Sequence, residues 1–150
     1  MAKSLTNGFT EKQVSLYTDQ YYERADLVFR FGALLTGSRE GAERLTEETF
    51  RLLLDDFAQV KEDTSASLLL MALAWKAWAK IKSERFHDWS MPILQSVSGL
   101  GVEQKAAWFA IEMAGLEMFE AGKVFGTDEN IVRKLLAEAQ KFLAVSSIRV

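Results

Sequence analysis

The sequence predicts an all-α fold, and three observations lead to that prediction. The chain has 150 residues but only nine glycines and one proline, so few positions interrupt a helix. Apolar residues recur at intervals of three and four almost throughout, which places them on one face of an α-helix. The strict apolar–polar alternation of half-buried strands is absent.

The first helix is predicted from its start and stop signals. Thr10 and Gln13 have the spacing of a capping box, so a helix is expected to begin there. Apolar residues then continue at helical spacing as far as Leu34, with Asp19 as a candidate break point. Gly37 is expected to end this helix.

Two more helices are expected before the middle of the chain. Ser38 is a suitable N-cap for a second helix that extends to about Val60. A third, capped by Thr64 or Ser65, is expected to extend to about Arg85. Its first half is apolar nearly all round, which is typical of a buried central helix.

Three further helices are expected in the C-terminal part, at about 102–114, 116–125 and 128–145. Thr127 is the predicted cap of the last helix, and Gly126 with Thr127 is expected to form a tight turn before it. The last two helices with this turn have the proportions of a helix-turn-helix.

The predicted domain organisation is two small helical domains joined by a short linker. Residues 9–86 form the first and residues 100–145 the second. The linker, 87–99, contains the only proline, Pro92, together with several small polar residues. Its shortness and its apolar residues favour two domains that pack against each other.

Composition argues against an enzyme or a metalloprotein. The chain has no cysteine and a single histidine, His87, so thiolate and histidine-rich metal sites are excluded. No glycine-rich loop matches a nucleotide-binding fingerprint, and adjacent acids such as Asp55 and Asp56 diverge on a helix. We therefore expect no catalytic residues, no metal and no cofactor.

The sequence predicts a cytoplasmic protein with no membrane segment. Met1 to Gly8 is polar and unlike a signal peptide. The longest apolar stretch, Leu68 to Trp75, is far shorter than the roughly 20 residues that span a bilayer. Lysines and arginines number 18 against 21 acidic residues, which argues mildly against duplex DNA as the main partner.

A resemblance to a known family is carried by residues Leu35–Phe50, with the sequence LTGSREGAERLTEETF. This run resembles the L-T-G-D-R-x-x-A-E-D-L-V-Q-E-T-F signature of the extracytoplasmic-function group of bacterial sigma factors. In that family the run joins two helices of region 2, the domain that binds core RNA polymerase. The resemblance implies that residues 9–86 correspond to region 2.

The run also departs from the signature at its partner-facing residues. In the family, the acids of A-E-D and the following helix face contact polymerase. Here Arg44 replaces the second acid, and a like charge facing a basic partner costs up to several kcal/mol. The residues expected to bind a partner on this helix are Glu43, Arg44, Glu47, Glu48 and Arg51.

The third predicted helix resembles the family segment W-L-x-x-I-A-R-N-x-A-x-D-x-x-R-R, which holds the unwound promoter strand. Trp75 and Trp78 beside cations have the composition of a stacking platform for single-stranded bases, although we favour both tryptophans as core residues. The possible nucleic-acid contacts here are Lys76, Lys80, Lys82 and Arg85.

Residues Leu100–Leu143 resemble region 4 of the family, the helix-turn-helix that reads the promoter. Framework positions such as Gly115, Leu116 and Gly126 are kept. The family's later basic positions on the recognition helix instead carry Leu135, Ala137, Glu138 and Gln140. Only Asn130, Arg133 and Lys134 remain as possible nucleic-acid contacts, so promoter binding is weakly supported.

The function expected from this resemblance is that of a sigma factor-like transcription regulator acting through protein–protein contacts. Such a mimic would bind an anti-sigma factor or another transcription regulator. Five apolar residues are expected to be surplus to a core of this size: Trp108, Phe109, Met113, Met118 and Phe119. All of these except Phe109 are the apolar residues predicted to bind a partner. Two alternatives are a divergent but active sigma factor that binds core RNA polymerase and promoter DNA, and a helical scaffold without a transcriptional role.

Overall fold

The computed structural model describes residues 10–57, 60, 65–86 and 99–148, and all regular secondary structure in these ranges is helical. The all-α prediction is therefore confirmed. In chain order the elements are α2 (Glu11–Leu16), the π-helical turn η1 (Tyr17–Tyr21), the 3₁₀ turn η2 (Tyr22–Arg24), α3 (Ala25–Thr36), α4 (Arg39–Asp55), α5 (Ala66–Ile81), α7 (Val102–Trp108), the π-helical turn η4 (Phe109–Met113), α8 (Met118–Phe125) and α9 (Glu129–Ile148).

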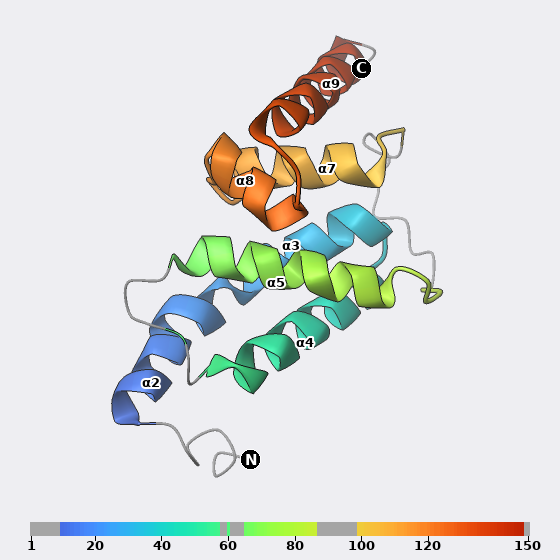
Figure 1. The fold of residues 1–150 in the computed structure, drawn as a ribbon. Coiled ribbons are helices and arrows are strands. Elements are labelled where there is room, and N and C mark those ends of the chain that lie inside the picture. Colours follow the sequence, from blue (N-terminus) through green and yellow to red (C-terminus); the bar gives the residue numbers. More distant parts are fainter. Residues whose placement is uncertain (1–9, 58–59, 61–64, 87–98, 149–150) are drawn as a thin grey trace.

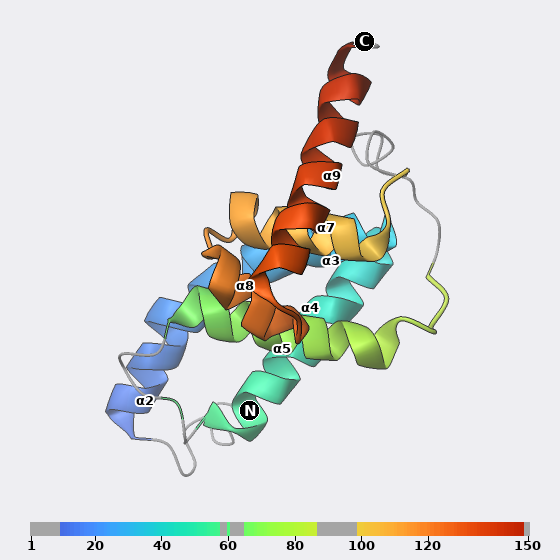
Figure 2. The ribbon, with the colours of Figure 1, turned by 45° about the horizontal axis from the view of Figure 1, so that its top comes forward.

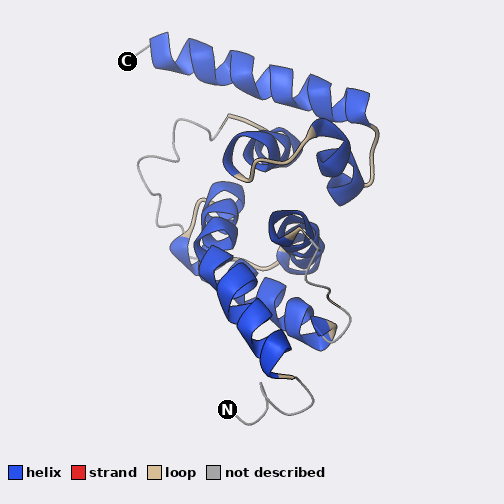
Figure 3. Ribbon diagram, turned by 90° about the vertical axis from the view of Figure 1, so that its left-hand side faces the viewer, coloured by secondary structure: helices blue, strands red, loops and turns tan. Residues whose placement is uncertain are grey.

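The helices are stacked in layers (Figure 1). Helices α3 and α5 form the middle, α4 and α2 lie on one side of them, and α7 and α8 lie on the other, with α9 outermost. Turning the molecule leaves α9 at its edge, and the C-terminal end of α9 extends past the other helices (Figures 2 and 3). Each helix therefore packs mainly against the next layer.

The first predicted helix is present, with the interruption expected near Asp19. Thr10 and Gln13 form the predicted capping box, since each backbone N–H donates to the other's side chain. The break consists of η1 and η2, which separate α2 from α3. Such irregular turns change the direction of the helix axis while the chain stays helical.

The turn between α3 and α4 is built as the sequence predicts. Gly37 adopts a left-handed conformation with φ 67°, which ends α3 at little cost for a residue without Cβ. Ser38 then caps α4 by accepting a hydrogen bond from the Gly41 N–H at 3.2 Å. The two helices approach closely at Gly32, where an added Cβ would lie 2.9 Å from the Cα of Ala42.

Two helix ends fall earlier than predicted. Helix α4 ends at Asp55 rather than near Val60, because consecutive acids at a C-terminus oppose the negative end of the helix dipole. Helix α5, capped by Ser65 through the Leu68 N–H, ends at Ile81 rather than near Arg85. Ile81 is its last buried residue, and the exposed residues after it have no apolar face to hold a further turn.

Helix α5 is the central element that its composition predicts. It packs against α4 and α3 on one side and against α8 on the other. Its fully buried residues recur at helical spacing along the inward face: Leu70, Met71, Ala74, Ala77 and Ile81. A helix enclosed on two sides needs this wide apolar surface.

The helix predicted at 102–114 is instead two elements, α7 and η4. The Ala114 N–H donates to the carbonyl of Phe109, five residues back, which widens the last turn. Phe109, expected to be surplus to the core, is buried and lies 5.0 Å from the ring of Phe31. The next helix begins at Met118 rather than at 116, because Glu117, with an extended backbone, is its N-cap and donates its N–H to the Glu120 side chain at 2.9 Å.

The cap predicted for the last helix is also wrong by one residue. Asp128, rather than Thr127, accepts a hydrogen bond from the Ile131 N–H at 3.0 Å. Gly126 has φ 67° and forms the predicted turn between α8 and α9. Helix α9 ends at Ile148, beyond the predicted 145.

Buried apolar residues from both parts of the chain belong to one cluster. Helix α7 packs on α3, and α8 packs on α5, partly through a T-shaped contact of Trp75 with Phe125 at 4.9 Å. Most of the predicted linker, 87–99, lies outside the described residues. The division into two domains therefore stays a prediction, while the packing between the two parts is observed.

Candidate partner-binding surfaces

Arg44, the residue that departs from the family signature, is neutralised within the chain. Its Nε and Nη2 donate to the two carboxylate oxygens of Glu84 at 3.2 and 3.3 Å. Glu84 follows the C-terminal end of α5, so this bidentate pair connects α4 with the end of α5. The sequence did not predict Glu84 as a partner, because the two residues are 40 positions apart.

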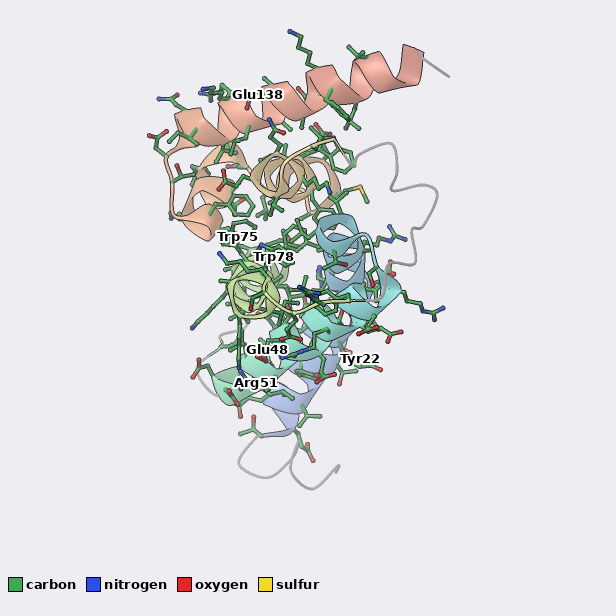
Figure 4. The ribbon with its side chains drawn as sticks, turned by 90° about the vertical axis from the view of Figure 1, so that its right-hand side faces the viewer. Tyr22, Glu48, Arg51, Trp75, Trp78 and Glu138 are labelled. Atoms are coloured by element: carbon green, nitrogen blue, oxygen red, sulfur yellow. The ribbon has the colours of Figure 1, made fainter. Side chains whose placement is uncertain are left out.

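Glu48 lies in the interior rather than on the outer face of α4. Its side chain is only 2% exposed, and it accepts hydrogen bonds from Arg51 and forms an ion pair with Lys80 of α5 at 2.6 Å. Figure 4 shows Glu48 and Arg51 close together on α4, near α5. Glu48 thus joins two helices instead of offering a charge to a partner.

This ion pair shifts the titration of the groups that form it. Hydrogen bonds from Arg51 and then from Lys80 lower the pKa of Glu48 to about 2, against the opposing effect of burial. The same contact raises the pKa of Arg51. Arg51 also reaches Asp55 at 2.9 Å, so three charged residues of α4 and one of α5 form a continuous network.

Of the acids predicted to bind a partner on α4, Glu43 and Glu47 are exposed. Glu43 is paired with Arg39 one turn away at 3.4 Å, an exposed pair of little energetic weight. Glu47 is exposed and has no ion pair or hydrogen bond with the residues that the structure describes. Glu47 is therefore the acid of this face that is most available to a partner.

The basic residues of α5 and of the turn after it differ in whether they are paired with an acid. Lys80 is used by Glu48, whereas Lys76, Lys82 and Arg85 are exposed. Trp75 and Trp78 are both partly buried against the core. Trp75 lies between α5 and the C-terminal helices in Figure 4. This placement agrees with the interpretation of both tryptophans as packing residues.

The apolar residues predicted to bind a partner are scattered. Met113 is 41% exposed and Phe119 is 49% exposed. Lys123 lies 5.5 Å from the Phe119 ring, so a cation covers part of that surface. Trp108 and Met118 are partly buried against the core. Met113 and Phe119 thus provide the exposed apolar area of this group.

The possible nucleic-acid contacts on α9 are also partly used within the helix. Arg133 donates to the carboxylate of Glu129 at 3.2 Å and to the side-chain oxygen of Asn130 at 3.1 Å. Lys134 is exposed and forms no ion pair within the described parts of the chain. A single helix of low net charge is a weak phosphate-binding surface.

A small pocket lies where α5 meets the three C-terminal helices. It has a volume of about 160 Å³. Its lining residues come from all four helices and the α8–α9 turn: Trp75, Glu103, Ala106, Phe125, Thr127, Ile131 and Leu135. The sequence does not predict this pocket, because its residues are far apart along the chain and only the packing brings them together.

Two further observations concern the described residues alone. Within them, no three histidine or acidic side chains converge as a metal site would require. In the same ranges, no helix is both long and apolar enough to cross a bilayer.

The layered arrangement is that of a sigma factor: the chain has a sigma-factor-like fold. The particular similarity is to the co-crystal structure of the sigma factor RpoE in complex with the anti-sigma factor NepR from Bartonella quintana. The TM-score is 0.72 at 12% identity, over 88% of this chain and 96% of that chain. No protein-family model matches the chain, and no curated protein matches it significantly.

Proposed function

We propose that this chain is a sigma factor-like transcription regulator that acts through protein–protein contacts. It would bind an anti-sigma factor or another transcription regulator in the place of a sigma factor. Within this proposal, residues 9–86 act as a region 2-like domain and residues 100–145 as a region 4-like helix-turn-helix domain. The proposal also implies a bacterial, cytoplasmic protein.

The observation that carries the proposal is the extent of the similarity to a sigma factor held by an anti-sigma factor. Because 88% of this chain is covered, the likeness includes both its N-terminal and its C-terminal helices. In this chain the two parts pack together through α3 with α7 and α5 with α8. The anti-sigma factor in complex with that sigma factor is therefore our model for the partner of this chain.

The charges support a protein partner over promoter DNA. Lys80 and Arg133, two of the predicted nucleic-acid contacts, are paired with acids of the chain itself. A cation that is already paired gains less from a phosphate, so the sequence-independent part of DNA affinity is reduced. The α4 face, in contrast, keeps the exposed acids Glu43 and Glu47 for a basic partner surface.

A second candidate, an active sigma factor that binds core RNA polymerase and promoter DNA, is favoured by one observation. Arg44 is held by Glu84, so the charge that departs from the family signature is neutralised rather than presented to polymerase. The neighbouring acid Glu47 remains exposed. The α4 face therefore keeps part of the chemistry that polymerase docking would use.

The experiment is a pull-down of the tagged full chain from a lysate of its own host, washed with increasing salt and analysed by mass spectrometry. The proposal predicts recovery of a small regulator without polymerase subunits. The variant Glu47→Lys should reduce that recovery about tenfold or more, since it places like charges at the contact. Glu23→Lys, an equal reversal at an exposed residue outside α4, is the matched control.

Two results would contradict the proposal. Recovery of the polymerase core subunits through the high-salt washes would favour the active sigma factor. Equal recovery by Glu47→Lys, Glu23→Lys and the wild-type chain would show that the α4 face makes no contact with the captured protein.

A further inference from the structure

The pocket at the junction of α5, α7, α8 and α9 has two aromatic walls. Trp75 and Phe125 meet edge to face, with an interplanar angle of 79° and a centroid distance of 4.9 Å. Two rings near a right angle form a corner in which a flat group can contact one ring face and the edge of the other. The volume of about 160 Å³ is similar to that of a cavity that admits a benzene ring.

The pocket also has a carboxylate. Glu103, in the first turn of α7, is exposed, lines the pocket and has no ion pair or hydrogen bond with the described residues. Apolar side chains come from the α9 residues Ile131 and Leu135, which also line the pocket. Aromatic rings and one unpaired carboxylate around a small space can bind a cation, because the ring faces have a negative electrostatic potential and the carboxylate has a negative charge.

The surrounding charges reinforce this preference. Glu138 lies one helical turn beyond Leu135 on α9 and accepts a hydrogen bond from Gln104, the neighbour of Glu103. Arg133, a residue of α9 with the opposite charge, is held by Glu129 of the same helix. Lys134 precedes Leu135 in the sequence but does not line the pocket. Among the described residues that line the pocket, Glu103 alone is charged.

We propose that this pocket receives an arginine side chain from a protein partner. The guanidinium group is flat, stacks on aromatic rings and pairs with a carboxylate through two parallel hydrogen bonds. Its flat face stacks on one of the two rings, Trp75 or Phe125, and its edge contacts the other, while Glu103 pairs with its charge. Because the pocket is formed by both parts of the chain, an inserted arginine also stabilises their packing.

Two other occupants fit this chemistry less well. A nucleobase would stack on Trp75, but its phosphates would lie near Glu103, and like charges repel. A leucine or phenylalanine side chain would fill the volume but would remove water from the Glu103 carboxylate without pairing it, which is costly. An arginine satisfies both the rings and the carboxylate.

The experiment uses a capped peptide, acetyl-Gly-Arg-Gly-amide, titrated into the full chain. The measurement is the NMR chemical shift of the Trp75 indole N–H. This signal is assigned by its absence in the variant Trp75→Phe. The matched peptide carries citrulline, which has the shape of arginine without the charge. We expect the arginine peptide to bind saturably. The affinity of the citrulline peptide should be lower by about fivefold or more.

The variant Glu103→Gln should weaken arginine binding about fivefold, while Glu23→Gln, which removes the same charge at an exposed residue outside the pocket, should leave it unchanged. Both residues are exposed, so both variants are expected to fold. The inference is wrong if the two peptides bind equally, if neither moves the Trp75 signal, if Glu103→Gln binds as the wild type, or if an oligothymidine of about eight nucleotides binds more tightly than the arginine peptide.

This inference rests on the proposed role in protein binding, but its test needs no knowledge of the partner. If the pull-down recovers polymerase while the arginine peptide binds Trp75 and Glu103, the pocket stands and the proposed function fails. If a small regulator is recovered and the peptide does not bind, the proposed function stands and the pocket inference fails.

Discussion

Helices α4 and α9 both carry charges that the sequence assigns to partners, yet the two helices use them differently. On α4, Arg44 and Glu48 form ion pairs with groups in and just after α5, and Glu48 is buried. On α9, Arg133 pairs with Glu129 of the same helix, and Lys134 is exposed. Charges that connect two helices contribute to stability, whereas charges on one exposed helix contribute little.

The largest effect is expected at Glu48. The variant Glu48→Gln loses charge-assisted hydrogen bonds with Arg51 and Lys80, so the free energy of unfolding should fall by about 2 kcal/mol. Urea unfolding at neutral pH measures the change. Glu47→Gln, at an exposed neighbour, is the control and should change it by less than about 0.5 kcal/mol. A loss at Glu47 as large as that at Glu48 would contradict the difference in burial.

The same residue predicts a pH dependence. The pKa of Glu48 is lowered in the folded state, to about 2 from 4.5, so the folded chain binds this proton less readily than the unfolded chain. The stabilisation is therefore complete above about pH 4.5 and is lost as the pH falls toward 2. The unfolding free energies of the wild type and Glu48→Gln should converge over that range, and a constant difference would be inconsistent with the buried pair.

A smaller effect is expected at the start of α9. Asp128→Ala removes the hydrogen bond to the Ile131 N–H, and loss of such a cap lowers the free energy of unfolding by about 1 kcal/mol. Thr127→Ala is the matched control, because Thr127 is the cap that the sequence predicts but the structure does not use. Thermal unfolding measures the loss of stability in both variants. A larger loss in Thr127→Ala than in Asp128→Ala would show that Thr127 is the cap of α9.

The sequence predicts those parts of the fold that depend on neighbouring residues. The capping box at Thr10, the Ser38 cap and the turns at Gly37 and Gly126 are all local, and each is present. The central position of α5 follows from its wide apolar surface. The length of α4 is one exception, because apolar spacing alone extends it past Asp55 and Asp56, the acids at its C-terminal end.

The parts that the sequence could not predict depend on contacts between distant residues. Arg44 was expected to face a partner, but the side chain that pairs with it comes from beyond the end of another helix. Phe109 was expected to be surplus, but the π-helical turn brings it against Phe31. The sequence does not predict the pocket either, because the residues that line it come from four helices and are distant along the chain.

A still smaller effect on the free energy of unfolding is expected for the Arg44–Glu84 pair. Both side chains are partly exposed, so Arg44→Glu should lower the free energy of unfolding by about 1 kcal/mol or less. The double variant Arg44→Glu/Glu84→Arg restores opposite charges and should recover most of the loss. A double-mutant cycle in urea measures the coupling, and zero coupling would show that the pair does not connect α4 to the end of α5.

The smallest effect on stability is expected on α9. Arg133→Gln and Lys134→Gln should each change the free energy of unfolding by less than about 0.5 kcal/mol, because both side chains are exposed on one helix. Thermal unfolding checks this. A loss comparable to that at Glu48 would mean that α9 is held by its charges, as α4 is.

The central claim is that the chain keeps the shape of a sigma factor but binds protein rather than DNA. The most direct measurement is the affinity of the full chain for labelled single-stranded and duplex DNA as the salt concentration is raised. We expect weak binding that falls with a slope near that of about one or two released counterions. Tight binding with a slope of about four or more, reduced in the triple variant Lys76→Gln, Lys82→Gln and Lys134→Gln, would contradict the claim.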